Sequence, residues 1–388
     1  MSYFTRGKFA FIAIAICLLL PMQAYRSSAL AAANPPAPAS ELTMTVRSSS
    51  NALMYSKLDI VNAKIIKSII KAKKEATEEA SLFADIEVQF TNGHQTTHYR
   101  LDRSGRLWET ASSQLLVLPS EVTSSLLHYG EIVRQSHYGK LMSWEEAERI
   151  VGRKSIFSIT ELESGLTFRV QRRAGSSHAD VQPISKEDSK IMKQIYDGKW
   201  SWKRKAVLVQ TGRIRIAASM NGMPHGGDGI PDNGFSGHFC VHFQDSTSHK
   251  SKTPDPAHQL MVHKAAGELK RYVESAAPDL LAESFVEAMY QKDKDMLTLI
   301  AQDVESDRLS YFIAKIDTLE SIRIDLPTGK KRITPKFSET DLVAEMKLPI
   351  KFHVKGHSDR ATTYTFQFKR ETPQQPWRIV DVIAKSKK

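Results

Sequence analysis

The stretch GHFCVHF at residues 237–243 decides how the middle of this chain folds. Its side chains alternate with the period of two that a β-strand imposes. The apolar and polar residues then lie on opposite faces, Phe239, Val241 and Phe243 against His238, Cys240 and His242. Because the apolar face packs into a core, we expect a strand whose other face presents one thiol and two imidazoles together.

The first residues of the chain predict export. Arg6 and Lys8 precede an apolar run over residues 9–21, and the tripeptide ALA at 29–31 has the small-x-small pattern of a secretory cleavage site. The run is shorter than the roughly twenty residues that a membrane span needs. We therefore expect residues 1–31 to be a signal peptide, no integral membrane segment in the mature chain, and a secreted or cell wall-associated protein.

The net charge and the number of cysteines indicate a basic protein without an intramolecular disulfide. The 388 residues carry a formal net charge of +11, and removal of the predicted signal peptide would leave +8. It would also remove Cys17 and leave Cys240 as a single cysteine, which excludes an intramolecular disulfide. A basic exported chain suits anionic surroundings, although the same charge also fits ordinary solubility.

Changes in composition and residue pattern along the chain predict an α+β multidomain protein. We expect a linker over 32–55, which starts with a Pro/Ala-rich segment, and a small α+β N-terminal domain over 56–152. A mostly-β central domain over 153–275 contains the Cys/His stretch. Helical and then strand patterns over 276–388 predict a C-terminal domain of a helix plus an antiparallel sheet, like the cystatin or nuclear-transport-factor folds.

Turn and cap residues place the elements of these domains. Hairpins are expected around three glycine-containing turns, Asn92-Gly93, Glu163-Ser164-Gly165 and Thr211-Gly212. Helices are expected over 56–80 and after the N-cap residues Ser143, Ser185 and Asp255. A glycine-rich loop over 222–237 separates a strand ending at Met220 from the strand of GHFCVHF, so these two strands could lie side by side.

The thiol of Cys240 needs a base if it is a nucleophile. Only the thiolate attacks, and a neighbouring imidazole that takes the proton makes it available. His238 and His242 lie about 6–7 Å from Cys240 along the strand and flank the sulfur more easily than they bond to it. His225, at the start of the glycine-rich loop, is the better candidate base if the two strands are neighbours.

The order His225-Gly226, a loop, then His238-x-Cys240 resembles the signature of L,D-transpeptidase catalytic domains, in which His-Gly is followed by Ser-His-Gly-Cys. The resemblance implies an exported cysteine acyltransferase acting on peptidoglycan stem peptides, on an all-β sandwich-like core. It implies Cys240 as nucleophile, His225 as base and His238 as supporting histidine, with backbone N–H groups forming the oxyanion hole.

The expected partners and binding residues follow partly from this resemblance and partly from the residues themselves. Peptidoglycan or another anionic wall polymer is the expected partner, with no nucleic acid, no cofactor and no metal. His242, Gly226, His178 and Asp180 are the expected substrate-binding residues; His242 stands where the family usually has Arg or Asn. The chain departs from the signature at Gly237, where the family has Ser, and at Phe239, where it has Gly.

Other interpretations of these residues stay open. Cys240 could be a structural core residue in a non-catalytic envelope protein that binds the wall. The histidines of the central domain could instead hold zinc, although their spacing matches no zinc signature: His178 beside Asp180, His225, His238, His242, His249 and His258. Asp180 could orient an imidazole or bind an ammonium, or it could satisfy backbone groups in a loop. In GKWSWKRK (198–205) we expect a strand with two buried indoles rather than a stacking platform.

Overall fold

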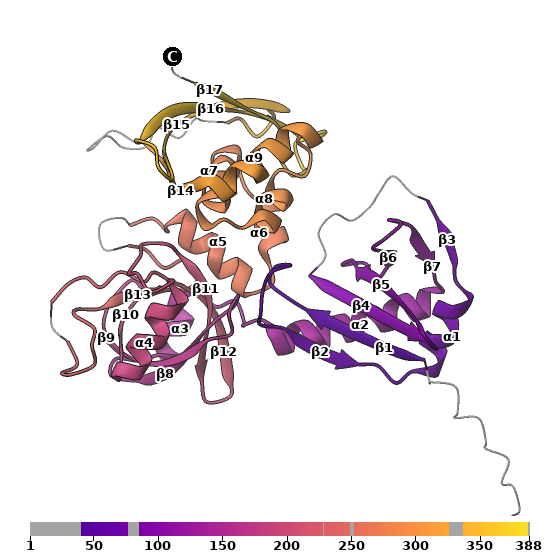
Figure 1. The fold of residues 1–388 in the computed structure, drawn as a ribbon, viewed down its shortest axis with the longest axis horizontal. Helices are drawn as coiled ribbons and strands as arrows, with labels where there is room; N and C mark the ends of the chain where they lie inside the picture. The colour runs from indigo at the N-terminus through magenta and orange to yellow at the C-terminus, as the bar shows by residue number, and fades with distance from the viewer. Residues whose placement is uncertain (1–39, 77–84, 228, 249–251, 326–336, 387–388) are drawn as a thin grey trace, which may run out of the picture. The chain divides into compact units, whose positions relative to one another are not determined.

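The computed structural model describes residues 40–76, 85–227, 229–248, 252–325 and 337–386 (Figure 1). Over these ranges the chain is mixed α/β, with nine helices and three sheets, one of them closed into a six-stranded barrel. The predicted signal peptide lies outside the described residues. None of the helices described is both long and apolar enough to cross a membrane.

The N-terminal part is a seven-stranded sheet in the order β2-β1-β4-β5-β6-β7-β3. Its strands are β1 (Glu41–Val46), β2 (Ser56–Asp59), β3 (Lys73–Glu75), β4 (Ile86–Asn92), β5 (Gln95–Leu101), β6 (Leu107–Glu109) and β7 (Leu115–Val117). The helices are α1 (Ala63–Lys71) and α2 (Ser120–His137). The predicted hairpin at Asn92-Gly93 is confirmed, because β4 and β5 pair around it and Gly93 has a φ of +62°.

Two expectations for this part differ from the structure. Residues 41–46, within the expected linker, form the strand β1. They do so because Leu42, Met44 and Val46 alternate as buried residues and the strand pairs with β4. The helix expected from residue 56 begins only after Asn62, whose side chain accepts hydrogen bonds from the N–H groups of Lys64 and Ile65. Residues 56–59 form β2 instead.

The central part is a closed barrel in the order β10-β13-β12-β11-β8-β9. Its strands are β8 (Ile156–Glu161), β9 (Thr167–Ala174), β10 (Ala179–Pro183), β11 (Lys205–Thr211), β12 (Ile214–Met220) and β13 (Phe239–His242). The predicted hairpins β8–β9 and β11–β12 are confirmed. The sheet closes on itself, whereas the transpeptidase resemblance implied a sandwich-like core.

Three helices accompany the barrel strands, α3 (Trp144–Ile150), α4 (Lys186–Ile195) and α5 (Pro256–Ala265). Their predicted N-caps are confirmed, because the side chains of Ser143, Ser185 and Asp255 accept from N–H groups of the first turn. α5 packs against β11 and β12. It therefore covers the outer face of the strand that leads to the glycine-rich loop.

The C-terminal part is a group of helices followed by a four-stranded antiparallel sheet in the order β14-β15-β16-β17. The helices are α6 (Leu269–Glu274), α7 (Pro278–Gln291), α8 (Lys294–Ile300) and α9 (Ser306–Thr318), and the strands are β14 (Leu319–Ile324), β15 (Val343–Val354), β16 (Arg360–Lys369) and β17 (Arg378–Ser386). Phe285 of α7 packs edge-on against Phe312 of α9 and Phe366 of β16, with ring centroids 5.1 and 5.4 Å apart. The predicted succession of helix and antiparallel sheet is confirmed; the likeness to named folds stays a prediction.

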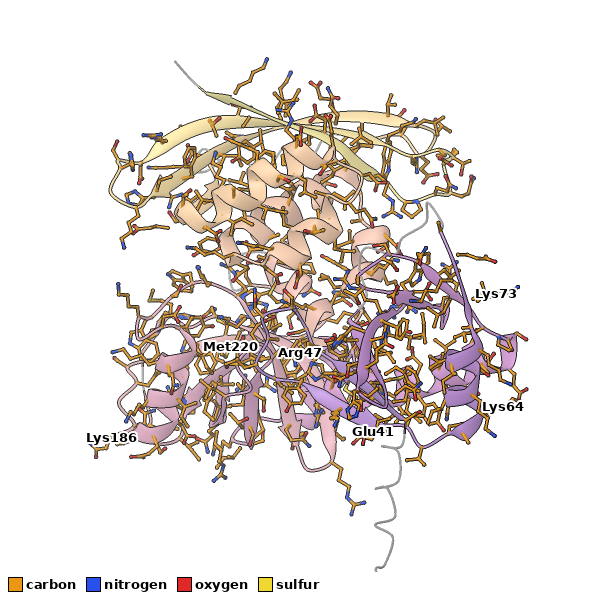
Figure 2. All side chains as sticks on the ribbon, turned by 45° about the vertical axis from the view of Figure 1, so that its right-hand side comes forward. Glu41, Arg47, Lys64, Lys73, Lys186 and Met220 are labelled. Atoms are coloured by element: carbon orange, nitrogen blue, oxygen red, sulfur yellow. The ribbon has the colours of Figure 1, made fainter. Side chains whose placement is uncertain are left out.

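Positive charge lies on exposed side chains in several elements. Lys64 of α1, Lys73 of β3 and Lys186 of α4 are all exposed (Figure 2). Met220, at the end of β12, is fully buried. Lys64 pairs with Glu121.

The expected strand with two buried indoles around Trp200 and Trp202 is wrong. Residues 200–204 form no strand, and Trp202 is 47% exposed. The hydroxyl of Ser201 accepts a hydrogen bond from the N–H of Lys203 (3.1 Å), a local turn that competes with extended pairing. β11 consequently begins only at Lys205.

Candidate active site

Cys240 lies on the outer face of the barrel. Phe239, Val241 and Phe243 are fully buried in its apolar interior, so the alternation predicted for GHFCVHF is confirmed. β13 lies between β10 and β12, and Cys240 is paired with Asp180 across the β10 edge. The sulfur therefore belongs to a layer of polar side chains outside the barrel wall, although the residue is only 6% exposed.

His225 contacts the thiol directly. Its Nε2 lies 3.3 Å from Sγ of Cys240, and its Nδ1 lies 2.8 Å from the carbonyl oxygen of Met223. A carbonyl can only accept, so Nδ1 carries a proton and the neutral ring presents the Nε2 lone pair to the thiol. This tautomer is the one that a base for Cys240 needs.

Two glycines bring His225 to this place. The backbones of His225 and His238 form an isolated antiparallel bridge, with N···O distances of 2.9 and 2.8 Å. Gly226 has a φ of +70°, and a Cβ there would lie 2.3 Å from Cε1 of His238. Gly237 has a φ of +91°, and a Cβ there would lie 2.4 Å from the carbonyl oxygen of His225. The serine of the transpeptidase signature has no room at position 237 of this chain.

Asp180 collects three of the predicted site residues around one carboxylate. One of its oxygens lies 3.1 Å from Nε2 of His178, 3.7 Å from Nε2 of His238 and 3.8 Å from Sγ of Cys240. Asp180 is 3% exposed. Its charge orients the two imidazoles and opposes ionisation of the thiol.

The surroundings of Cys240 keep it protonated at rest. Burial, and secondly the charge of Asp180, raise the pKa of the thiol to about 12, against a hydrogen bond from the Asn221 side chain that lowers it. The resting sulfur is therefore a thiol, with Nε2 of His225 beside it. A thiolate forms when the proton moves to His225 during reaction.

Three imidazoles stack beside the thiol. The ring centroids of His178 and His242 are 4.5 Å apart with planes at 10°, and those of His242 and His258 are 3.8 Å apart with planes at 9°. Burial is the main cause that depresses the pKa of His242 and of His258 well below the usual histidine value, and the stacked imidazoles and the Arg204 guanidinium add to it. These two rings are therefore neutral at neutral pH.

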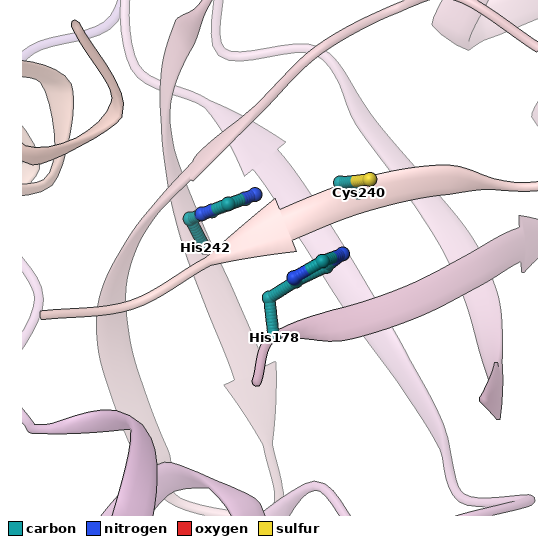
Figure 3. A group of neighbouring side chains, drawn as sticks. All are labelled: His178, Cys240 and His242. Carbon is teal, nitrogen blue, oxygen red and sulfur yellow. The ribbon is translucent and has the colours of Figure 1, made fainter. Parts of the chain in front are cut away.

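His178, Cys240 and His242 are also the residues that could hold a metal ion (Figure 3). Their ligand atoms all lie within 4.8 Å of one another. The two imidazole planes are nearly parallel, however, and lone pairs in parallel planes do not converge on one point. A tetrahedral zinc ion would require one ring to turn out of the stack.

Trp202 extends the site beyond the thiol. Its indole lies 5.2 Å from the His225 ring, measured between centroids. It also borders a pocket of about 390 Å³ that Arg204, Asp255 and Tyr290 help to line. An exposed aromatic surface thus adjoins the candidate base.

The structure brings together Cys240, His225, His238, His178, Asp180, His242 and Gly226, as the hypothesis of a shared site requires. It adds Asn221 and Trp202, which the sequence analysis did not select as site residues. Asn221 follows directly on the strand expected to lie beside GHFCVHF, so its position opposite the thiol could have been found by extending that register. His258, which the sequence analysis named only as a possible zinc ligand, stacks on His242. His249 lies outside the described residues.

No protein-family model matches this chain, and no curated protein matches it in a sequence comparison.

Proposed function

We propose that the barrel performs cysteine-dependent acyl transfer or hydrolysis on a peptide amide, with Cys240 as nucleophile and His225 as base. The observation that carries this proposal is the 3.3 Å contact between Sγ and Nε2, with Nδ1 held by the Met223 carbonyl. A structural cysteine needs no oriented lone pair beside its sulfur. The Met223 carbonyl keeps the proton of the His225 ring on Nδ1, so that Nε2 is free to take the proton of the thiol.

The reaction uses two proton transfers through one imidazole. His225 takes the thiol proton as the sulfur attacks the amide carbon, and a C–S bond forms. The C–N bond then breaks, and the amine leaves with the proton from His225. An acceptor amine or a water molecule gives a proton to the same nitrogen as it attacks the thioester. The C–S bond then breaks, and the proton on His225 returns to the sulfur, which restores the thiol.

The proposed substrate is a stem peptide of peptidoglycan. The motif resemblance and the predicted signal peptide support this choice, and exposed lysines suit an anionic polymer. We accordingly propose a secreted or wall-associated enzyme. Asp180, His178 and His242 would line the approach to the thioester, and Trp202 offers a flat surface to the substrate beside the base.

The test is detection of the acyl-enzyme. The purified chain is incubated with peptidoglycan stem peptides, and intact mass spectrometry is expected to show a thioester on Cys240. Cys240→Ala should carry none, and His225→Asn should slow its formation by about a hundredfold or more, the range expected for loss of a general base. His98→Asn, on an exposed histidine of β5, is the matched control and should change nothing. No adduct on the native chain with any stem peptide would overturn the proposal.

Zinc binding is a second candidate function, favoured by the proximity of His178, Cys240 and His242. Titration with Co²⁺ separates the two. A metal site gives an absorption band from thiolate-to-cobalt charge transfer that Cys240→Ser abolishes, whereas the parallel imidazoles predict no band at micromolar cobalt. A stoichiometric band in the native chain would favour the metal interpretation over acyl transfer.

A further inference from the structure

The geometry points to Asn221 as a further catalytic residue, whose carboxamide holds the sulfur as thiolate and then the oxyanion of the acyl-transfer transition state. This inference rests on the proposed function, since it assigns a role within the same reaction. The residue comes directly after β12, on the opposite side of Cys240 from Asp180.

Strand register places Asn221 against the thiol. Ser219 pairs with His242 and Met220 with Val241, so the next position along faces Cys240. The N–H of Asn221 donates to the carbonyl oxygen of Cys240 over 3.3 Å, which continues the pairing by one residue. Directly opposed residues of neighbouring strands point to the same face. Asn221 and Asp180 therefore flank the sulfur from its two neighbouring segments.

The state of the side chain fits a polar role at the sulfur. Asn221 is 3% exposed, and its side chain, which lies opposite Cys240 across the strand pair, lowers the pKa of the thiol. Its Oδ1 is buried with no hydrogen-bond partner in the described part of the chain. An unpaired buried oxygen is unfavourable. An asparagine that were merely structural would be expected to have its oxygen paired, whereas here that oxygen is available to a substrate N–H.

The same donor can serve the thiolate and the oxyanion. When sulfur bonds to the carbonyl carbon, the carbonyl oxygen lies within about 3 Å of the sulfur, so a donor that faces the sulfur can also reach the oxyanion. Asp180, on the other side, is an acceptor and repels negative charge. The Asn221 carboxamide, and not Asp180, therefore stabilises the developing anion.

The test measures thiol reactivity without any substrate. Asn221→Leu keeps the volume and removes the donor. The rate of iodoacetamide labelling of Cys240 is followed from pH 7 to 10 in the full chain. The variant is expected to react at least tenfold more slowly at each pH, because a hydrogen bond to a charged group is lost. Asn221→Asp, which adds a carboxylate beside the sulfur, should react more slowly still.

Gln210→Leu is the matched control, because the amide of this β11 residue donates to the carbonyl oxygen of Gly212 and not to the sulfur. Its labelling profile should match that of the native chain, and thermal unfolding is used to confirm that all variants are folded. Equal labelling rates for folded Asn221→Leu and native chain would overturn the assignment. This result is independent of the acyl-enzyme experiment, whose failure would remove the reaction while leaving the effect of Asn221 on the thiol intact.

Discussion

At the scale of single residues, the site depends on backbone positions as much as on reactive side chains. His225 reaches the thiol because Gly226 and Gly237 allow two segments to approach within a distance that excludes any Cβ. The motif departure at Gly237 is therefore a structural requirement of this chain. A substitution there tests whether the base is positioned by the backbone bridge.

Gly237→Ser should destabilise the fold and displace His225. The added Cβ meets a carbonyl oxygen, and a φ of +91° strains any other residue, so we expect a loss of about 1–3 kcal/mol or more in the free energy of unfolding. Urea unfolding measures the loss. Gly212→Ser, at a turn with a φ of +55° and nothing within 4 Å of the added Cβ, is the control and should cost distinctly less. Equal costs would contradict the crowding argument.

The buried histidines predict a loss of stability in acid. Burial lowers the pKa of His242 and His258 in the folded chain below the unfolded value of about 6.5. The unfolded state therefore binds more protons as the pH falls below that value, and the folded state loses stability. The melting temperature should be highest above pH 7 and fall progressively toward pH 5. His258→Phe should flatten this dependence; an unchanged slope would show that other groups cause it.

At the scale of elements, α5 ties the stacked imidazoles to the barrel. It begins with Asp255, which caps two N–H groups and also accepts from Arg204 over 2.7 Å. Its first turn carries His258, which stacks on His242 and bonds to Ser219. The start of this helix therefore positions one end of the polar layer around Cys240.

Asp255→Ala should lower the free energy of unfolding by more than the loss of an ordinary helix N-cap does. Loss of an N-cap typically costs about 1 kcal/mol. Here the half-buried Arg204 also loses its partner, so we expect about 2–3 kcal/mol in the free energy of unfolding. Ser143→Ala removes the cap of α3 without breaking an ion pair and is the control. Chemical denaturation of both variants gives the comparison, and equal losses would show that the Arg204 contact contributes nothing.

Across the whole molecule, one buried lysine joins distant segments of the chain. Lys264 of α5 is 6% exposed; its ammonium lies 2.5 Å from a carboxylate oxygen of Glu163, in the β8–β9 turn, and also contacts Asp293, the N-cap of α8. The two carboxylates hold the pKa of Lys264 above its usual value despite burial. Its charge is therefore retained in the folded chain.

Lys264→Met should be severely destabilising. It leaves two carboxylates close together without their cation, and breaking a buried pair in this way costs about 3–5 kcal/mol. Lys294→Met removes one partner of an exposed pair with Asp317 and should cost less than about 1 kcal/mol. Unfolding in urea compares the two. A small effect for both would show that the buried cation is not a major support of the fold.

The sequence predicted the elements that depend on residues close together in the chain. It did not predict that the central sheet closes into a barrel. Alternation in GHFCVHF and the turn at Thr211-Gly212 are local signals, and they led to the strand, the hairpin and the approach of His225 to Cys240. Closure of the barrel through β10–β13 pairing is a contact between residues 60 apart in the chain. His258 was named only among possible zinc ligands; its stacking on His242 depends on the packing of α5 against the barrel, which no local pattern indicated.

The shielding of Cys240 has a consequence for its durability. Peroxides and other oxidants consume the ionised form of a cysteine and largely spare the protonated form. With its sulfur buried beside Asp180 and its pKa raised to about 12, we expect this cysteine to resist conversion to sulfenic acid. If the predicted leader sequence is removed on export, Cys240 has no second cysteine in the same chain with which to form a disulfide, so a thiol that stays protonated at rest would survive longer than a permanent thiolate.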